Sequence, residues 1–117
     1  MPNNDAILVI ASPEFQRRLK ALAKRYRHIR SDLQPILETL QAGNFLGEQV
    51  QGTNYTVLKL RIKNSDAQRG KSGGYRLIYQ IVDSTVIRLV LIYSKSDQED
   101  VVADDIVTII ESLPKEI

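Results

Sequence analysis

Four cations at strand-like spacing are the residues of this sequence best suited to chemistry. Lys59, Arg61 and Lys63 stand at every second position of the run LKLRIK, so a strand would present all three on one face. Arg76 belongs to the run YRLIYQIV, whose β-branched and aromatic residues also indicate a strand. Lysine and arginine neutralise phosphate oxygens, and arginine does so with paired hydrogen bonds. These residues predict an anion-binding sheet face, although a solvated strand face is the simpler interpretation of the pattern alone.

The run RGKSGG at 69–74 resembles a nucleotide-binding loop only at first sight. A phosphate-binding P-loop needs a glycine where this sequence has Ser65, and it must open a helix whose N-terminus holds the anion. Here the run that follows, from Tyr75 onward, is typical of a strand. The sequence therefore argues against nucleotide binding.

The composition fits one globular domain over residues 1–117, with 43% hydrophobic and 26% charged residues. The chain has no cysteine, which excludes disulfides and thiolate chemistry. No apolar run approaches the roughly 18 residues of a membrane span, and the first ten residues lack the pattern of a signal peptide. We expect a cytoplasmic protein.

The charge is unevenly distributed although the formal net charge is only +2. Most of the cations fall between residues 14 and 30 or between residues 59 and 76, whereas the chain from Ser96 onward is acidic. Such polarity favours a partner or substrate that is negatively charged.

Apolar periodicity predicts a short strand over 6–11 and then two helices. Ser12 should cap the first helix, which the spacing places from Glu14 to about His28. Ser31 should cap the second, which ends near Gly43 and carries Pro35 among its first amides, where proline is tolerated. So short a connection predicts an antiparallel helix hairpin.

Three strands and a helix should complete the chain. After a loop over about 43–54, we expect strands over 58–63, 75–82 and 86–93, the last two joined by a turn at 83–84. Ser96 and Glu99 have the spacing of a capping box for a final amphipathic helix that ends before Pro114. The order β-α-α-β-β-β-α predicts an α+β fold, an antiparallel sheet packed on helices.

With these elements in place, the sequence resembles the RelE/ParE superfamily of toxins from bacterial type II toxin-antitoxin modules. The likeness rests on the K-x-R strand, the run GKSGGYRLIYQI and the ending LIYSKSDQEDV, and it is closest to the RelE and HigB type. It implies a microbial-RNase-like fold and a metal-independent endoribonuclease, an mRNA interferase that cuts mRNA on the ribosome and inhibits translation. It also implies a cognate antitoxin protein as partner, and neither cofactor nor membrane.

The resemblance carries over to particular residues. Lys59 and Arg61 match the basic pair of the family's second strand, Arg76 matches the arginine of its G-Y-R segment, and Lys95 lies where a further basic residue often follows the last strand. Two positions depart from the best-known RelE toxins, because Ser96 and Val102 stand where an arginine and a tyrosine are expected.

From these matches we expect a catalytic set of three cations. Lys59 is the candidate general base for the 2′-hydroxyl, if neighbouring cations lower its pKa, while Arg61 and Arg76 stabilise the charge of the pentavalent phosphate. The expected RNA-binding residues are Lys63, Arg69, Lys71, Tyr93 and Lys95. Tyr75 and Tyr79 should pack in the core instead, since they alternate with apolar residues.

Two other functions are compatible with the sequence. One is a ParE-like toxin that inhibits gyrase by binding, and the other is a degenerate toxin that only holds its antitoxin. The single histidine, His28, lies in the basic helix, where we do not expect a catalytic role. The acidic residues at 97, 99 and 100 suit the start of a helix better than a metal site.

Overall fold

The computed structural model describes residues 7–66, 73–97 and 101–113, and it confirms the α+β class. The elements, in chain order, are β1 (Leu8–Ala11), α1 (Pro13–Arg25), α2 (Ile29–Gln41), β2 (Glu48–Gln49), β3 (Val57–Ile62), β4 (Tyr75–Asp83), β5 (Val86–Ser94) and α3 (Ala103–Glu111). The predicted order is present, with the two-residue strand β2 added inside the expected loop. β4 extends to Asp83, so the turn falls at residues 84–85, one residue later than predicted.

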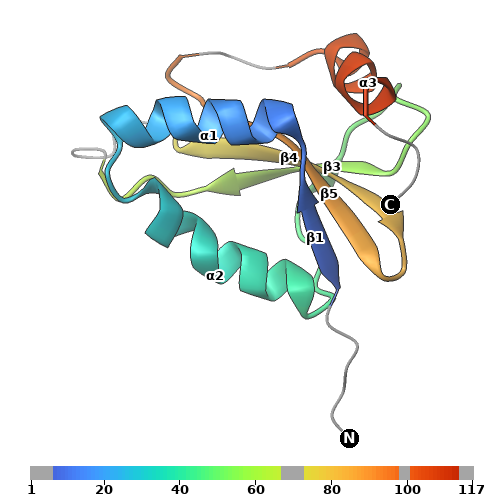
Figure 1. The fold of residues 1–117 in the computed structure, drawn as a ribbon, viewed down its shortest axis with the longest axis horizontal. Coiled ribbons are helices and arrows are strands. Elements are labelled where there is room, and N and C mark those ends of the chain that lie inside the picture. The colour runs from blue at the N-terminus through green and yellow to red at the C-terminus, as the bar shows by residue number, and fades with distance from the viewer. Residues whose placement is uncertain (1–6, 67–72, 98–100, 114–117) are drawn as a thin grey trace, which may run out of the picture.

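The strands form one sheet in the order β1-β5-β4-β3-β2 (Figure 1). β3, β4 and β5 pair antiparallel, as their short connections predicted. β1 pairs parallel to β5 at one edge, and β2 pairs antiparallel to β3 at the other. The chain therefore brings its first strand beside its last one.

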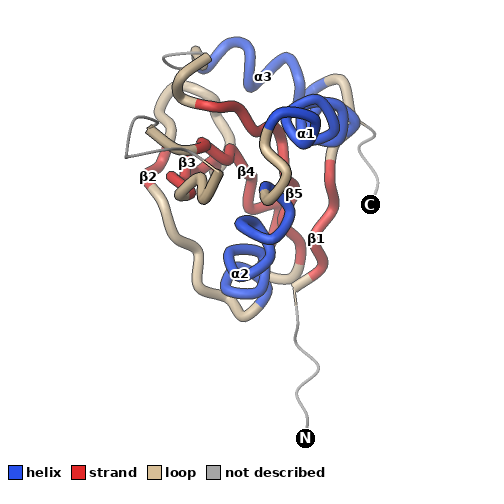
Figure 2. Tube along the Cα trace, turned by 90° about the vertical axis from the view of Figure 1, so that its left-hand side faces the viewer, coloured by secondary structure: helices blue, strands red, loops and turns tan. Residues whose placement is uncertain are grey.

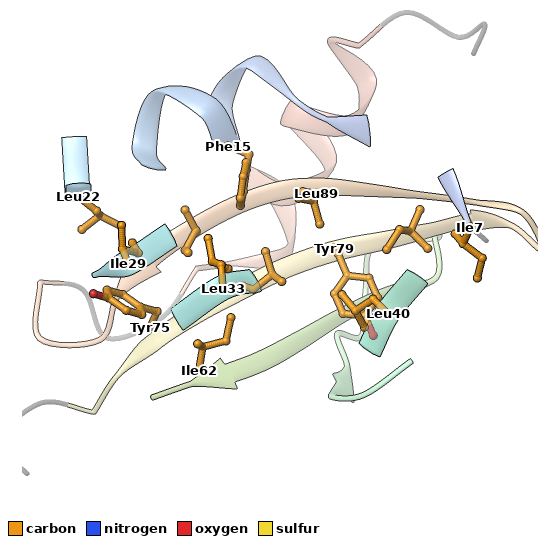
Figure 3. Close-up of a cluster of buried hydrophobic side chains, with 13 residues drawn as sticks. Ile7, Phe15, Leu22, Ile29, Leu33, Leu40, Ile62, Tyr75, Tyr79 and Leu89 are labelled. Carbon is orange, nitrogen blue, oxygen red and sulfur yellow. The ribbon is translucent and has the colours of Figure 1, made fainter. Parts of the chain in front are cut away.

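One face of the sheet is covered by α1 and α2, which run in opposite directions across it (Figure 1). Leu58, Leu60 and Ile62 of β3 point to this face, as the alternation predicted. Tyr75 and Tyr79 join them and are fully buried, with helix residues such as Leu33 packed above (Figure 3). We call this side the helix-covered face.

The opposite side, which we call the second face, is only partly covered. α3 packs there through Ile106 and Ile110 on a smaller cluster that includes Val57, Ile78 and Leu91. In the view of Figure 2, α3 and α2 lie on opposite sides of the strands. The charged positions of β3 and β4 alternate with the core residues, so they also belong to the second face.

The start of α1 confirms its predicted cap, whereas α2 begins earlier than predicted. Ser12 Oγ accepts a hydrogen bond from the amide of Phe15 at 2.9 Å, and Pro13 is the first helical residue. The Ser31 cap is wrong, because α2 starts at Ile29 and the backbone N–H of its N-cap, His28, is bound by the Asp66 carboxylate at 2.7 Å. A partner far along the chain thus fixes a helix start that local spacing cannot show.

The earlier start also places Pro35 inside α2 and not in its first turn. Its missing amide therefore removes one intrahelical hydrogen bond. An ordinary residue at this position would donate its amide to a carbonyl one turn earlier. The helix nevertheless continues to Gln41, because the buried residues Leu33 and Leu40 anchor it on both sides of the proline.

The start of α3 also differs from the prediction. The helix begins at Ala103 with Val102 as N-cap, so the capping box of Ser96 and Glu99 is wrong for Ser96, and Glu99 lies outside the described residues. Ser96 Oγ hydrogen-bonds Ser94 Oγ at 2.9 Å instead. Ser96 lies just after the end of β5. The chain must pass from there to the apolar cluster of the second face, which we call the second cluster, before α3 can bury its apolar side chains.

Candidate functional site

Two arginines and a tyrosine form one row across the second face. Arg61 on β3 lies directly opposite Arg76 on β4, and Arg76 lies opposite Tyr93 on β5. Directly opposed side chains have Cβ atoms about 4.5–5.5 Å apart, and like charges in such a pair repel. The register therefore places the two arginines side by side at a cost in stability, which an anion bound by both would offset.

A second row lies beside the first. Lys59 stands two residues before Arg61 on the same face of β3, about 7 Å away along the strand. Opposite Lys59, on the edge strand β2, lies Glu48. Both side chains line a hollow of about 220 Å³, whose walls also include Ile78 of β4 and Ile106 of α3. A glutamate and a lysine thus line one concavity next to the arginine row.

Arg76 is fixed by the segment that precedes its strand. Its Nη1 donates to the carbonyl oxygen of Gly73 at 2.6 Å. A Cβ built on Gly73 would lie 2.7 Å from Cγ of Lys95, so Lys95 packs directly against this glycine. The Gly73 backbone therefore holds Arg76 and Lys95 close to each other, at the end of the arginine row.

Gly74, the second glycine of the pair, is required for its backbone conformation. Gly74 has φ +80°, and a Cβ there would lie 2.4 Å from the carbonyl oxygen of Ile62. Only glycine tolerates both the left-handed conformation and this close approach of two backbones. The two glycines of the run GKSGGYR thus shape the start of β4, which is consistent with the argument against a phosphate loop.

The remaining candidate RNA-binding residues differ in their exposure to solvent. Lys63 follows β3 directly and is exposed, whereas Tyr93 is only 3% exposed and packs in the second cluster. Stacking of a base on Tyr93 would therefore require the cover over this cluster to open. Arg69 and Lys71 lie outside the described residues.

Sequence reasoning missed Glu48. It falls in a stretch that reads as a loop, and β2 has only two residues, too few for a periodic pattern. Its position opposite Lys59 emerges only from strand pairing. The one available signal was its chemistry, since a glutamate among glycines and polar residues ahead of a cationic strand is a possible proton acceptor.

His28 lies away from both rows, in a contact that joins two loops. Its Nδ1 is 2.6 Å from Oδ1 of Asp66, and Ser65 donates through its amide and hydroxyl to Oδ2 of Asp32 at 2.9 and 3.1 Å. The hydrogen bonds from His28 lower the pKa of the Asp66 carboxyl. His28 thus helps to attach the end of the β3 segment to the start of α2.

The described residues contain no cluster of three or more histidine, cysteine, aspartate or glutamate side chains arranged to hold a metal ion. Within the same residues, no helix has the length and apolar character needed to cross a bilayer.

Comparison of structures relates this fold to a known toxin. A double arginine-to-alanine mutant of the E. coli toxin RelE, solved in the free state, superposes with a TM-score of 0.54 at 21% sequence identity. The match covers 88% of this chain and 95% of RelE. It confirms the predicted RelE-like fold.

The sequence itself matches the family described as ParE toxin of the type II toxin-antitoxin system parDE, over residues 9–99. The chain therefore belongs to this family within the RelE/ParE superfamily, and the predicted superfamily is confirmed. Membership implies an antitoxin partner. No curated protein sequence gives a significant match.

Proposed function

We propose that this toxin is an endoribonuclease that cleaves mRNA on the ribosome and so inhibits translation. The observation that carries the proposal is the pair of rows on the second face, with Arg61 opposite Arg76 and Lys59 opposite Glu48. Opposed guanidiniums suit the phosphate whose negative charge grows during cleavage. A carboxylate and an ammonium one step along the sheet supply an acceptor and a donor of protons.

In the proposed reaction the 2′-hydroxyl of the RNA loses its proton to Glu48, and its oxygen attacks the adjacent phosphorus. Arg61 and Arg76 stabilise the pentavalent phosphate. The bond from phosphorus to the 5′-oxygen breaks, Lys59 gives that oxygen a proton, and a 2′,3′-cyclic phosphate remains. The step needs neither a metal nor a cofactor, and Lys63 and Lys95, with Arg69 and Lys71, contact the RNA backbone.

This assignment changes the role that the sequence suggested for Lys59. Glu48 carries a carboxylate, an ordinary proton acceptor, whereas a lysine can act as a base only from its neutral amine form. Lys59 as base is the competing assignment. Glu48→Gln should abolish cleavage if Glu48 is the base and leave most of it if Lys59 is the base.

The test is a translating extract to which purified toxin is added, with the ends of the message mapped by primer extension. We expect cuts within ribosome-bound codons that Arg76→Ala reduces by about 100-fold or more, since a single charge-stabilising donor is worth that much. Arg30→Ala is the matched control, because Arg30 is exposed on α2, on the helix-covered side. An intact message with the unmodified toxin would contradict the proposal.

The family match favours one second candidate, a toxin that binds gyrase without cutting RNA. The same preparation should then block supercoiling of plasmid DNA by gyrase while the message in the extract stays intact. Inhibition of neither process would support a degenerate toxin that only binds its antitoxin.

A further inference from the structure

Arg88 is a buried cation for which the described residues supply no counter-charge. It lies on the second face of β5, directly opposite Gln80 on β4, and the two residues are only 8% and 7% exposed. Its Nη1 donates to Gln80 Oε1 at 3.3 Å, a long bond to a neutral group. No described carboxylate forms an ion pair with it. Because arginine is rarely buried unpaired and a desolvated charge is costly, this guanidinium is suited to an anion from outside the domain.

The surface beside Arg88 is apolar. Leu8 and Ile10 of β1 point to the second face, since Val9 and Ala11 between and after them pack in the core of the helix-covered face. Ile10 is paired with Arg88 in the sheet, and Leu8 is 54% exposed. β1 is the edge strand of the sheet, so this patch is open to a partner.

The donor pattern selects the kind of anion. Gln80 uses its carbonyl oxygen to accept from Arg88, so its amide group is left to donate, and the two side chains together offer mainly donors to a partner. Planar, paired donors fit a carboxylate. A charged anchor that is desolvated among apolar residues is also the usual anatomy of a binding hot spot between proteins.

We propose that Arg88, Gln80, Leu8 and Ile10 form a docking site for an antitoxin segment that carries an aspartate or glutamate flanked by apolar side chains. The partner follows from the family, and its chemistry follows from the apolar surface and from a guanidinium that pairs with none of the described carboxylates. The site lies beyond the rows that contain Arg61 and Lys59, so the proposal is independent of whether the toxin cuts RNA.

The first test measures the affinity of the full-length toxin for its cognate antitoxin by titration calorimetry. Arg88→Met should weaken binding by about 30-fold, because it removes one partner of a buried charged contact. Leu8→Asp, at an exposed position, should weaken binding by about tenfold through repulsion of the incoming carboxylate. Arg30→Met, which removes the same charge from the opposite side, should bind like the unmodified toxin.

Stability and partner mutations separate docking from a purely structural role. In the free toxin, Arg88→Met should raise the Tm, because an unpaired buried charge gives way to an apolar group. Each acidic residue of the antitoxin is then changed to its amide, and one such change should weaken binding to the unmodified toxin but not to Arg88→Met. Unchanged affinity in both Arg88→Met and Leu8→Asp would overturn the proposal, as would a lower Tm with no single antitoxin residue coupled to Arg88.

Discussion

The two faces of the sheet use the same strands for different purposes. On the helix-covered face, β3 and β4 contribute only apolar or aromatic side chains, and Leu77 and Tyr79 are fully buried beneath α1 and α2. On the second face the same strands carry Lys59, Arg61 and Arg76, and α3 covers only part of the surface. The helix-covered face buries the larger apolar cluster, whereas the second face combines a smaller apolar cluster with charged side chains.

The two faces should differ in how a substitution changes the stability of the fold. Burial of apolar area stabilises the domain chiefly through the helix-covered face, whereas the opposed arginines of the second face cost stability. Substitutions on the two faces should therefore have opposite profiles of stability and activity. Adjacent residues on one strand provide the sharpest comparison.

The largest effect on stability is expected at Leu77, which neighbours Arg76 on β4 but is fully buried on the helix-covered face. Leu77→Ala should lower the free energy of unfolding by about 2–5 kcal/mol, because it leaves a cavity in the core. Arg76→Gln should leave it unchanged or raise it slightly, since it removes the repulsion from Arg61. Urea denaturation of both variants measures this, and a similar loss in both would contradict the division between the faces.

The glycine pair offers a second comparison. Gly74→Ala should destabilise the fold by at least about 2 kcal/mol, because a Cβ at φ +80° would meet the backbone of Ile62. Gly73→Ala would meet Cγ and Cβ of Lys95 at 2.7 and 3.1 Å but no backbone of another strand, so it should destabilise the fold less than Gly74→Ala. Gly73→Ala should also lower activity by displacing Lys95 and Arg76. Thermal unfolding combined with the message-cleavage assay checks both, and equal melting temperatures for the two variants would refute the distinction.

How well each region could be predicted from the sequence follows from the range of the interactions that determine it. The alternation of β3 was sufficient to place Leu58 and Lys59 on opposite faces, because strand periodicity is local. The position of Glu48 opposite Lys59, in contrast, depends on a two-residue strand that forms only by pairing. The start of α2 likewise depends on Asp66, far along the chain.

The candidate docking site around Arg88 could not be predicted from the sequence for the same reason. The apolar run VIRLVLIY around Arg88 is typical of a central strand, but it does not show which groups the arginine side chain meets. Its burial follows from the central place of β5 between β1 and β4, and the parallel pairing with β1 is a long-range contact. Residues whose role arises from such contacts cannot be identified by local pattern alone.

A smaller effect is expected at Ser12, which links the helix-covered face to β5. Its hydroxyl accepts from the amide of Phe15 and donates to the carbonyl oxygen of Val90 at 2.7 Å, and its side chain is buried. Ser12→Ala should cost about 1–2 kcal/mol, since it removes both the helix cap and a buried hydrogen bond. Ser12→Thr keeps the hydroxyl and should recover most of the loss in urea denaturation, whereas an equal loss would show that the space around Ser12 is what matters.

The smallest effect is expected where the two loops meet, at Asp66. Contacts with His28 lower the pKa of this carboxyl in the folded state, so the ionised form stabilises the fold at pH values above the unfolded pKa of about 3.9. That contribution is lost as the pH falls through the lowered folded-state pKa. Asp66→Asn should therefore reduce stability at pH 7, and the difference from the unmodified toxin should shrink toward zero in strong acid. Urea titrations at several pH values measure this difference, and one that stays constant down to pH values well below about 3.9 would show that the carboxylate charge contributes nothing.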